Sequence, residues 1–171
     1  MYSFEFDNII HQFDEVILNK GIYLSVVHAN KIPPHIGIVV DGKYFSLKAK
    51  GKDINVPVKD LLKIIHRNQI ASLFLQIPKI ITIEDILTIY QSFNKAVAYE
   101  SSCLTPIKHI FQLGDEIQKL GDLLKVLNQS QSIVSVYGVN IQDEYKGIPA
   151  YEVDAIHQRL EILATKSKQH V

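Results

Sequence analysis

The chain contains a single cysteine, Cys103, among its 171 residues. One cysteine excludes an intramolecular disulfide and a zinc site built on cysteine ligands. An excess of positive charge is also missing, because 18 lysines and arginines balance 18 aspartates and glutamates. A neutral chain argues against a non-specific nucleic-acid binder, which normally has a basic surface. We interpret the lysines of residues 43–52 as a solvated turn region.

Long hydrophobic runs are absent from the sequence as well. No stretch of about 18 or more apolar residues occurs, so no membrane span is expected. The first ten residues, MYSFEFDNII, carry acidic groups and do not lead into a long apolar run, so a secretory signal is not expected. These features together predict a cytoplasmic protein.

Motifs for nucleotides and metals are missing too. The sequence has no G-x-G-x-x-G and no phosphate-binding loop, and its histidines show no H-x3-H spacing. Internal repeats and low-complexity tracts are also absent. The sequence therefore predicts no metal, no nucleotide and no other cofactor.

The residues that are present predict one domain over 1–171 with an α+β fold. Hydrophobic residues make up 47% of the chain, which is enough for a buried core. Alternation and helical periodicity predict strands over 22–28, 35–40, 43–49, 70–77 and 132–140, and helices over 4–18, 57–67, 82–97, 104–113, 115–128 and 151–166. Asp41-Gly42 between two apolar runs predicts a tight hairpin. Because strands and helices partly segregate, we expect a small antiparallel sheet packed against helices.

Two residues in this arrangement carry chemistry. His35 opens an apolar strand, and Cys103 lies near the start of the helix predicted over 104–113. A helix N-terminus stabilises a thiolate, and a histidine held by a rigid strand can accept the thiol proton. A depressed thiol pKa is therefore expected if the two form a site. The alternatives are an inert, packed cysteine and a histidine with a structural role.

The pattern around these residues resembles circularly permuted papain-like hydrolases. Asn19-Lys20-Gly21-Ile22-Tyr23 is followed by a loop and by His35-Ile36-Gly37-Ile38-Val39-Val40-Asp41-Gly42-Lys43. This order is similar to the histidine strand and tight turn of the permuted NlpC-type peptidases, the YiiX-like amidases and the lecithin:retinol acyltransferase group. In these families a nucleophilic cysteine follows later, at the start of a helix. The resemblance covers about residues 19–113, and residues 114–171 would form a C-terminal extension.

The resemblance implies an acyl-transfer reaction with Cys103 as the nucleophile and His35 as the general base. Its substrate would be a small acyl compound, a peptide or a lipid. These families usually carry a histidine, asparagine, glutamine or glutamate on the next strand, where it orients the imidazole. The corresponding residue here is Ser46, which orients a ring only weakly. The alternative is therefore a catalytically inactive papain-like domain that binds a peptide, a lipid or a protein.

Overall fold

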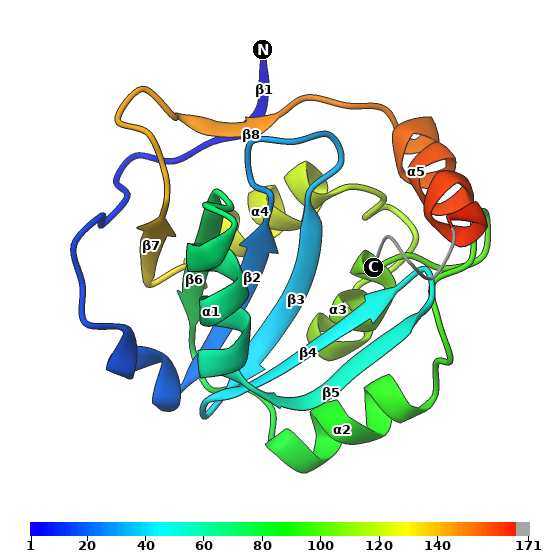
Figure 1. Ribbon diagram of the computed structural model, residues 1–171, viewed down its shortest axis with the longest axis horizontal. Helices are drawn as coiled ribbons and strands as arrows, with labels where there is room; N and C mark the ends of the chain where they lie inside the picture. The colour runs from blue at the N-terminus through cyan, green and yellow to red at the C-terminus, as the bar shows by residue number, and fades with distance from the viewer. Residues whose placement is uncertain (167–171) are drawn as a thin grey trace.

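Six strands form the central antiparallel sheet, in the order β5-β4-β3-β2-β6-β7 (Figure 1). Its strands are β2 (Ile22–Val27), β3 (His35–Val40), β4 (Lys43–Lys48), β5 (Gly51–Pro57), β6 (Ser72–Ile77) and β7 (Ser135–Val139). A second sheet pairs β1 (Tyr2–Glu5) with β8 (Gly147–Pro149). This computed structural model describes residues 1–166.

Helices cover both faces of the central sheet. They are the 3-10 helix η1 (Glu15–Asn19) and the α-helices α1 (Val58–Arg67), α2 (Ile83–Gln91), α3 (Leu104–Phe111), α4 (Leu120–Gln129) and α5 (Val153–Thr165). Figure 1 shows α1 in front of the sheet, with α3 and α4 behind it. The described residues thus form an α+β protein with a mainly antiparallel sheet, as the sequence predicted.

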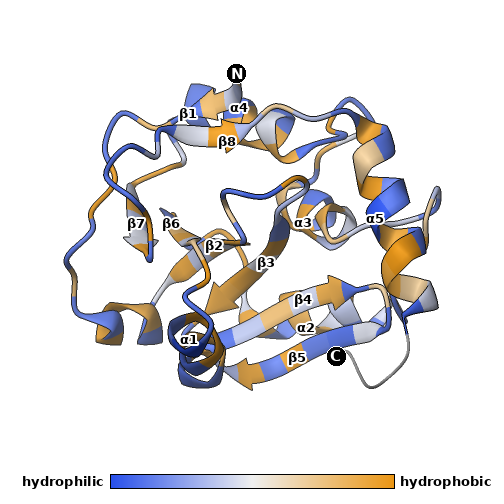
Figure 2. Cartoon of the chain, turned by 45° about the horizontal axis from the view of Figure 1, so that its top comes forward, coloured by the Kyte–Doolittle hydropathy of each residue, from blue (hydrophilic) through white to orange (hydrophobic). Residues whose placement is uncertain are grey.

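Side-chain alternation along β3 gives the sheet its two cores. Ile36, Ile38 and Val40 belong to the larger core, which includes residues of α2, α3 and α4. Val39 belongs to a second core with residues of α1, on the face that His35 also shares. Figure 2 shows the hydrophobic character of β2 and β3 and the hydrophilic residues of α1. The histidine therefore opens a strand that is buried on both faces.

The hairpin between β3 and β4 forms where the sequence predicted it. Val40 pairs with Lys43, and the two residues between them have positive φ angles of 46° at Asp41 and 82° at Gly42. This left-handed pair matches the twist of antiparallel strands. The Asp41 carboxylate also accepts a hydrogen bond from the Gly21 amide at 2.9 Å, which ties the turn to the start of β2.

Gly37 is required for close packing between β3 and its neighbours. A Cβ atom at this position would lie 2.6 Å from the Phe45 carbonyl oxygen and 2.6 Å from Cε1 of Tyr44. We expect Gly37→Ala to lower the free energy of unfolding by about 1–3 kcal/mol, as overpacking typically does. Urea denaturation measures it, with Gly114→Ala as the control because its Cβ would meet only the mobile carboxylate of Glu116. Equal stability of the two variants would contradict the prediction.

The helix predicted over 4–18 is wrong. The chain there forms β1, an extended segment and η1 instead. The Ile10 amide donates to the Val136 carbonyl at 2.8 Å, and the Ile10 carbonyl accepts from the Gly138 amide at 2.9 Å. Phe13 packs on the ring of Tyr137 with centroids 4.9 Å apart. These hydrogen bonds to β7 replace the helical ones, so tertiary contacts override the local periodicity.

The segment after residue 113, which the resemblance implies is a C-terminal extension, takes part in the central sheet. Its strand β7 pairs with β6 from Ser72↔Val139 to Gln76↔Ser135. Its strand β8 holds the N-terminal strand β1. The extension thus supplies one edge of the sheet that contains His35.

Candidate functional site

His35 is the first residue of β3, opposite Val27 of β2. The residue is partly buried, and its Nε2 atom is inaccessible, with no hydrogen-bond partner in the described part of the chain. Burial lowers the pKa of His35 from 6.5 to about 4, and the positive charges of Lys48 and His28 act in the same direction. The negative charge of Asp53 opposes them. The imidazole is therefore neutral at physiological pH, and its Nε2 atom can still form a hydrogen bond.

Cys103 immediately precedes α3 and already has helical backbone angles, φ −60° and ψ −22°. Neighbouring hydroxyl groups cap this helix in its place. Ser102 Oγ accepts from the Leu104 amide at 3.2 Å, and Thr105 Oγ1 accepts from the Ser102 amide at 2.9 Å. The thiol makes no capping hydrogen bond, so the sulfur is left for other contacts.

The structure brings Cys103 to the start of β3. The backbone of Ile36 hydrogen bonds to the sulfur and lowers the thiol pKa, together with the backbone of Cys103 and Leu104. Ile36 directly follows His35 in the chain, and α3 packs on β3. The Ala96 amide donates to the Lys48 carbonyl at 2.8 Å, which attaches the segment before Cys103 to the end of β4. Two of the predicted site residues therefore lie in the same region of the fold.

The thiol pKa differs from the sequence-based expectation. A depressed pKa was expected for a thiol at a helix N-terminus beside a histidine. Burial instead raises the pKa of Cys103 from 9.0 to about 11, because desolvation outweighs the three backbone hydrogen bonds. The form described by the structure therefore holds a neutral thiol at Cys103 and a neutral imidazole at His35.

Ser46 lies on β4, opposite Gly37 of the histidine strand, and it is fully buried. Its hydroxyl donates to Oδ2 of Asp53 at 2.8 Å. The proton of Ser46 is therefore directed to the carboxylate and not to His35. This geometry gives Ser46 a part in holding Asp53, while its role beside the imidazole stays a prediction.

Asp53 is the polar residue that sequence reasoning missed, because nothing in the local pattern distinguishes it from a surface or capping residue. It pairs with Ser46 across the strands β4 and β5 and forms an ion pair with Lys48 at 3.1 Å. Its charge is the one that favours the protonated form of His35. Predicting β5 would have revealed it, because a β4–β5 hairpin places Asp53 on the same sheet face as Ser46 and His35.

Three tyrosines lie close enough to Cys103 for its charge to affect their pKa values: Tyr44, Tyr90 and Tyr151. Burial raises the pKa of all three, and that of Tyr151 to about 12. They are neutral hydrogen-bond donors at physiological pH. The hydroxyl of Tyr90 is buried without a hydrogen-bond partner among the described residues. Three buried tyrosines therefore lie in the neighbourhood of the thiol, and the hydroxyl of Tyr90 has spare hydrogen-bonding capacity.

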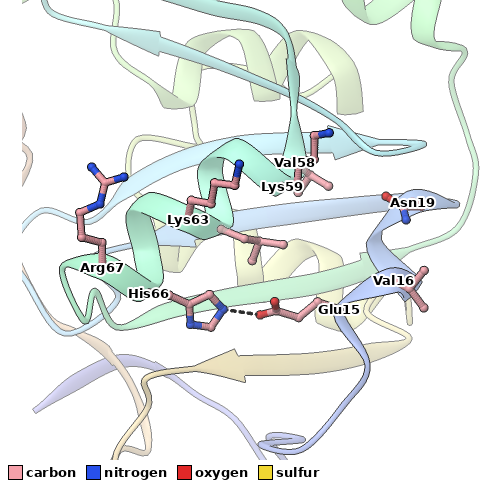
Figure 3. A pocket seen from close by; sticks show the side chains of 9 residues that line it. Glu15, Val16, Asn19, Val58, Lys59, Lys63, His66 and Arg67 are labelled. Atoms are coloured by element: carbon pink, nitrogen blue, oxygen red, sulfur yellow. Dashed lines mark hydrogen bonds and ion pairs between the residues drawn. The ribbon is translucent and has the colours of Figure 1, made fainter.

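A surface hollow of about 580 Å³ lies elsewhere, between η1 and α1 (Figure 3). Glu15 and His66 form an ion pair across it at 2.7 Å, and Lys59, Lys63 and Arg67 lie along its helical side. None of the three predicted site residues lines this hollow. The hollow and the buried thiol are therefore separate features of the molecule.

Residues 1–166 contain neither a candidate metal centre nor a membrane-spanning helix. Within residues 1–166, no group of three or more histidine, cysteine, aspartate or glutamate residues is placed to hold a metal ion. No helix in the same range has the length and apolar character needed to cross a membrane. No family model, no curated protein and no solved structure matches the chain.

Proposed function

We propose that the chain is a cysteine amidase, peptidase or acyltransferase of the circularly permuted papain-like type. The observation that supports this is the hydrogen bond from the Ile36 backbone to the Cys103 sulfur, directly next to His35. Cys103 also begins a helix, where backbone amides point toward its thiol. A nucleophile and a base carried by two rigid elements are the minimum requirement for nucleophilic catalysis.

The proposed reaction begins from the neutral pair. As the sulfur attacks the carbonyl carbon of an amide, ester or thioester, the thiol proton passes to His35. The negative charge that develops on the carbonyl oxygen is held by the backbone amide of Cys103. The tetrahedral species then expels the amine, alcohol or thiol, which takes the proton from His35. Water or a second acceptor attacks the resulting thioester, and His35 accepts its proton. The bond from the acyl carbon to the Cys103 sulfur then breaks, the acyl product leaves, and the thiolate takes the proton back from His35.

Asp53 would support the charged intermediate state of His35. Its negative charge raises the pKa of the imidazole, whereas burial lowers it. Lys48 forms an ion pair with the same carboxylate and lowers the pKa of His35, so it weakens the effect of Asp53. The balance favours an imidazole that is protonated only while the thiolate or the oxyanion is present. The substrate class stays as the sequence predicted it, a small acyl compound, a peptide or a lipid, in a protein predicted to be cytoplasmic.

A binding module on the same fold is the second candidate function. The observation that favours it is the pair of pKa values, about 11 for Cys103 and about 4 for His35. Both shifts come mainly from burial, and both suppress the ion pair that activates a cysteine. In this function Cys103 is an inert packing residue, and the domain binds a peptide, a lipid or a protein.

The two functions differ in how Cys103 reacts with iodoacetamide. For the enzyme, we expect the wild-type thiol to react at neutral pH at least about tenfold faster than in His35→Ala, because the imidazole removes its proton. The wild-type rate should stay level from about pH 5 to about pH 9, while the rate of the variant should rise with the thiolate. His66→Ala is the control, because that histidine pairs with Glu15 beside α1.

Each outcome selects one of the two functions. Since the chain has one cysteine, all alkylation comes from Cys103. Equal rates in wild type and His35→Ala, both rising only toward the thiol pKa of about 11, would refute the Cys–His pair and leave the binding module.

A further inference from the structure

Helix α5 lies at the margin of the fold and has no fully buried residue over Val153–Thr165. Only a few of its side chains, Ala155, Ile156 and Leu160, pack against the larger core, which Cys103 also borders. Figure 1 shows α5 at the right edge, above the free end of the β4–β5 hairpin. Elements with few buried apolar contacts open at a lower free-energy cost than the rest of a fold.

One end of α5 is attached to the segment that leads into Cys103. The Tyr99 amide donates to Nδ1 of His157 at 2.8 Å. The two rings are stacked, with centroids 4.3 Å apart and planes at 21°. A bridge between Val97 and Ser101 closes the loop that carries Tyr99, and Cys103 follows two residues later. The contact between Tyr99 and His157 therefore couples the position of α5 to the segment before Cys103.

Two further interactions connect α5 with the histidine side of the site, one electrostatic and one a hydrogen bond. The charge of Arg159 lowers the pKa of His28, and the charge of His28 acts in turn on His35. Lys50, in the turn between β4 and β5, donates to the carbonyl of Lys166 just after the helix. A cation at this end of a helix is favourable. The helix thus reaches from the cysteine segment to the β4–β5 turn, next to the strand that carries Asp53.

We propose that α5 is a strap that closes the Cys103–His35 site, held by the stack and hydrogen bond between Tyr99 and His157, and that it lifts to admit a ligand. The proposal rests on the proposed site. The strap would cover the edge of the larger core that Cys103 borders, against which Ala155, Ile156 and Leu160 pack. A ligand that reached the site would have to displace the least buried helix beside it.

The rate of Cys103 alkylation by iodoacetamide in the full chain tests the strap. His157→Ala removes the ring stack and the acceptor of the Tyr99 amide, so we expect alkylation about tenfold faster than in the wild type. His157→Phe keeps a stacking ring without the acceptor and should give an intermediate rate. His66→Ala is the matched control, because His66 is an exposed histidine of α1 whose side-chain partner is Glu15 of η1. It should react like the wild type.

Global unfolding must be separated from the opening of α5, so urea denaturation is measured for every variant. An unchanged alkylation rate in His157→Ala overturns the strap, and so does a rise that its loss of global stability fully explains. The result with His35→Ala is independent of these outcomes. Faster alkylation in His157→Ala supports the strap even if His35→Ala reacts like the wild type, a result that would refute only the proposed chemistry.

Discussion

Lowering the pH from about 7.5 to about 4.5 is expected to reduce the stability of the wild type by about 2.5 kcal/mol more than that of a His35→Gln variant. The folded pKa of His35 is about 4, against an ordinary value of 6.5. Because the folded pKa is lowered, the unfolded chain takes up the proton first. The stability contributed by the neutral imidazole is therefore complete above pH 6.5 and is lost as the pH falls toward 4.

Urea denaturation of both proteins at the two pH values measures this effect. The other titrating groups are common to the two proteins, so the difference between their pH dependences isolates His35. The Asp53→Asn variant should lose more stability than the wild type over this pH range. Without the Asp53 charge, burial lowers the pKa of His35 further in the folded protein. Parallel pH dependences of wild type and His35→Gln would show that the imidazole is solvated in the folded protein, contrary to the structure.

The parts of the fold that local sequence specifies were predicted correctly. Asp41-Gly42 sets a turn whose left-handed residues only a few side chains accept, and the strands on each side follow from it. Thr82 caps α2, and its Oγ1 accepts from the Asp85 amide at 3.2 Å. The start of α3 after Cys103 follows from the Ser102 and Thr105 hydroxyls. In each case the determining contact lies within a few residues.

The parts that depend on distant contacts were missed. The residues over 4–18 have helical periodicity, but β7 provides hydrogen bonds to Ile10 that a local pattern does not reveal. Strand β5 has few apolar residues, so the local pattern does not reveal it as a strand and does not place Asp53 in the sheet. Only the pairing of Ser46 with Asp53 shows that a carboxylate lies near His35.

The candidate site shows the same division between local and distant effects. Sequence order alone placed Cys103 at a helix N-terminus, where the helix lowers a thiol pKa. The amount of burial depends on the larger core against which Cys103 packs, and the residues of that core are distant in sequence. Burial has the larger effect and raises the pKa of Cys103 to about 11. A helix N-terminus therefore indicates where a thiolate is favoured, and the surrounding packing decides whether the thiolate forms.

Replacing Cys103 by alanine has the largest expected effect on the proposed activity. The structure gives the chain one thiol, and the proposed reaction passes through a thioester on it. We therefore expect Cys103→Ala to reduce hydrolysis of activated acyl esters and thioesters by about a thousandfold or more. The fold should persist, because alanine retains the Cβ atom and the hydroxyls of Ser102 and Thr105 still cap α3.

The measurement combines turnover with detection of the acyl-enzyme by mass spectrometry after an acid quench. Ser102→Ala is the matched control, since it removes the neighbouring cap of α3 and should cost about 1 kcal/mol of stability while retaining the acyl adduct. An adduct that maps to Cys103 in the wild type and disappears in Cys103→Ala supports a covalent mechanism. Undiminished turnover in Cys103→Ala refutes it, because the chain has no other thiol to carry the acyl group.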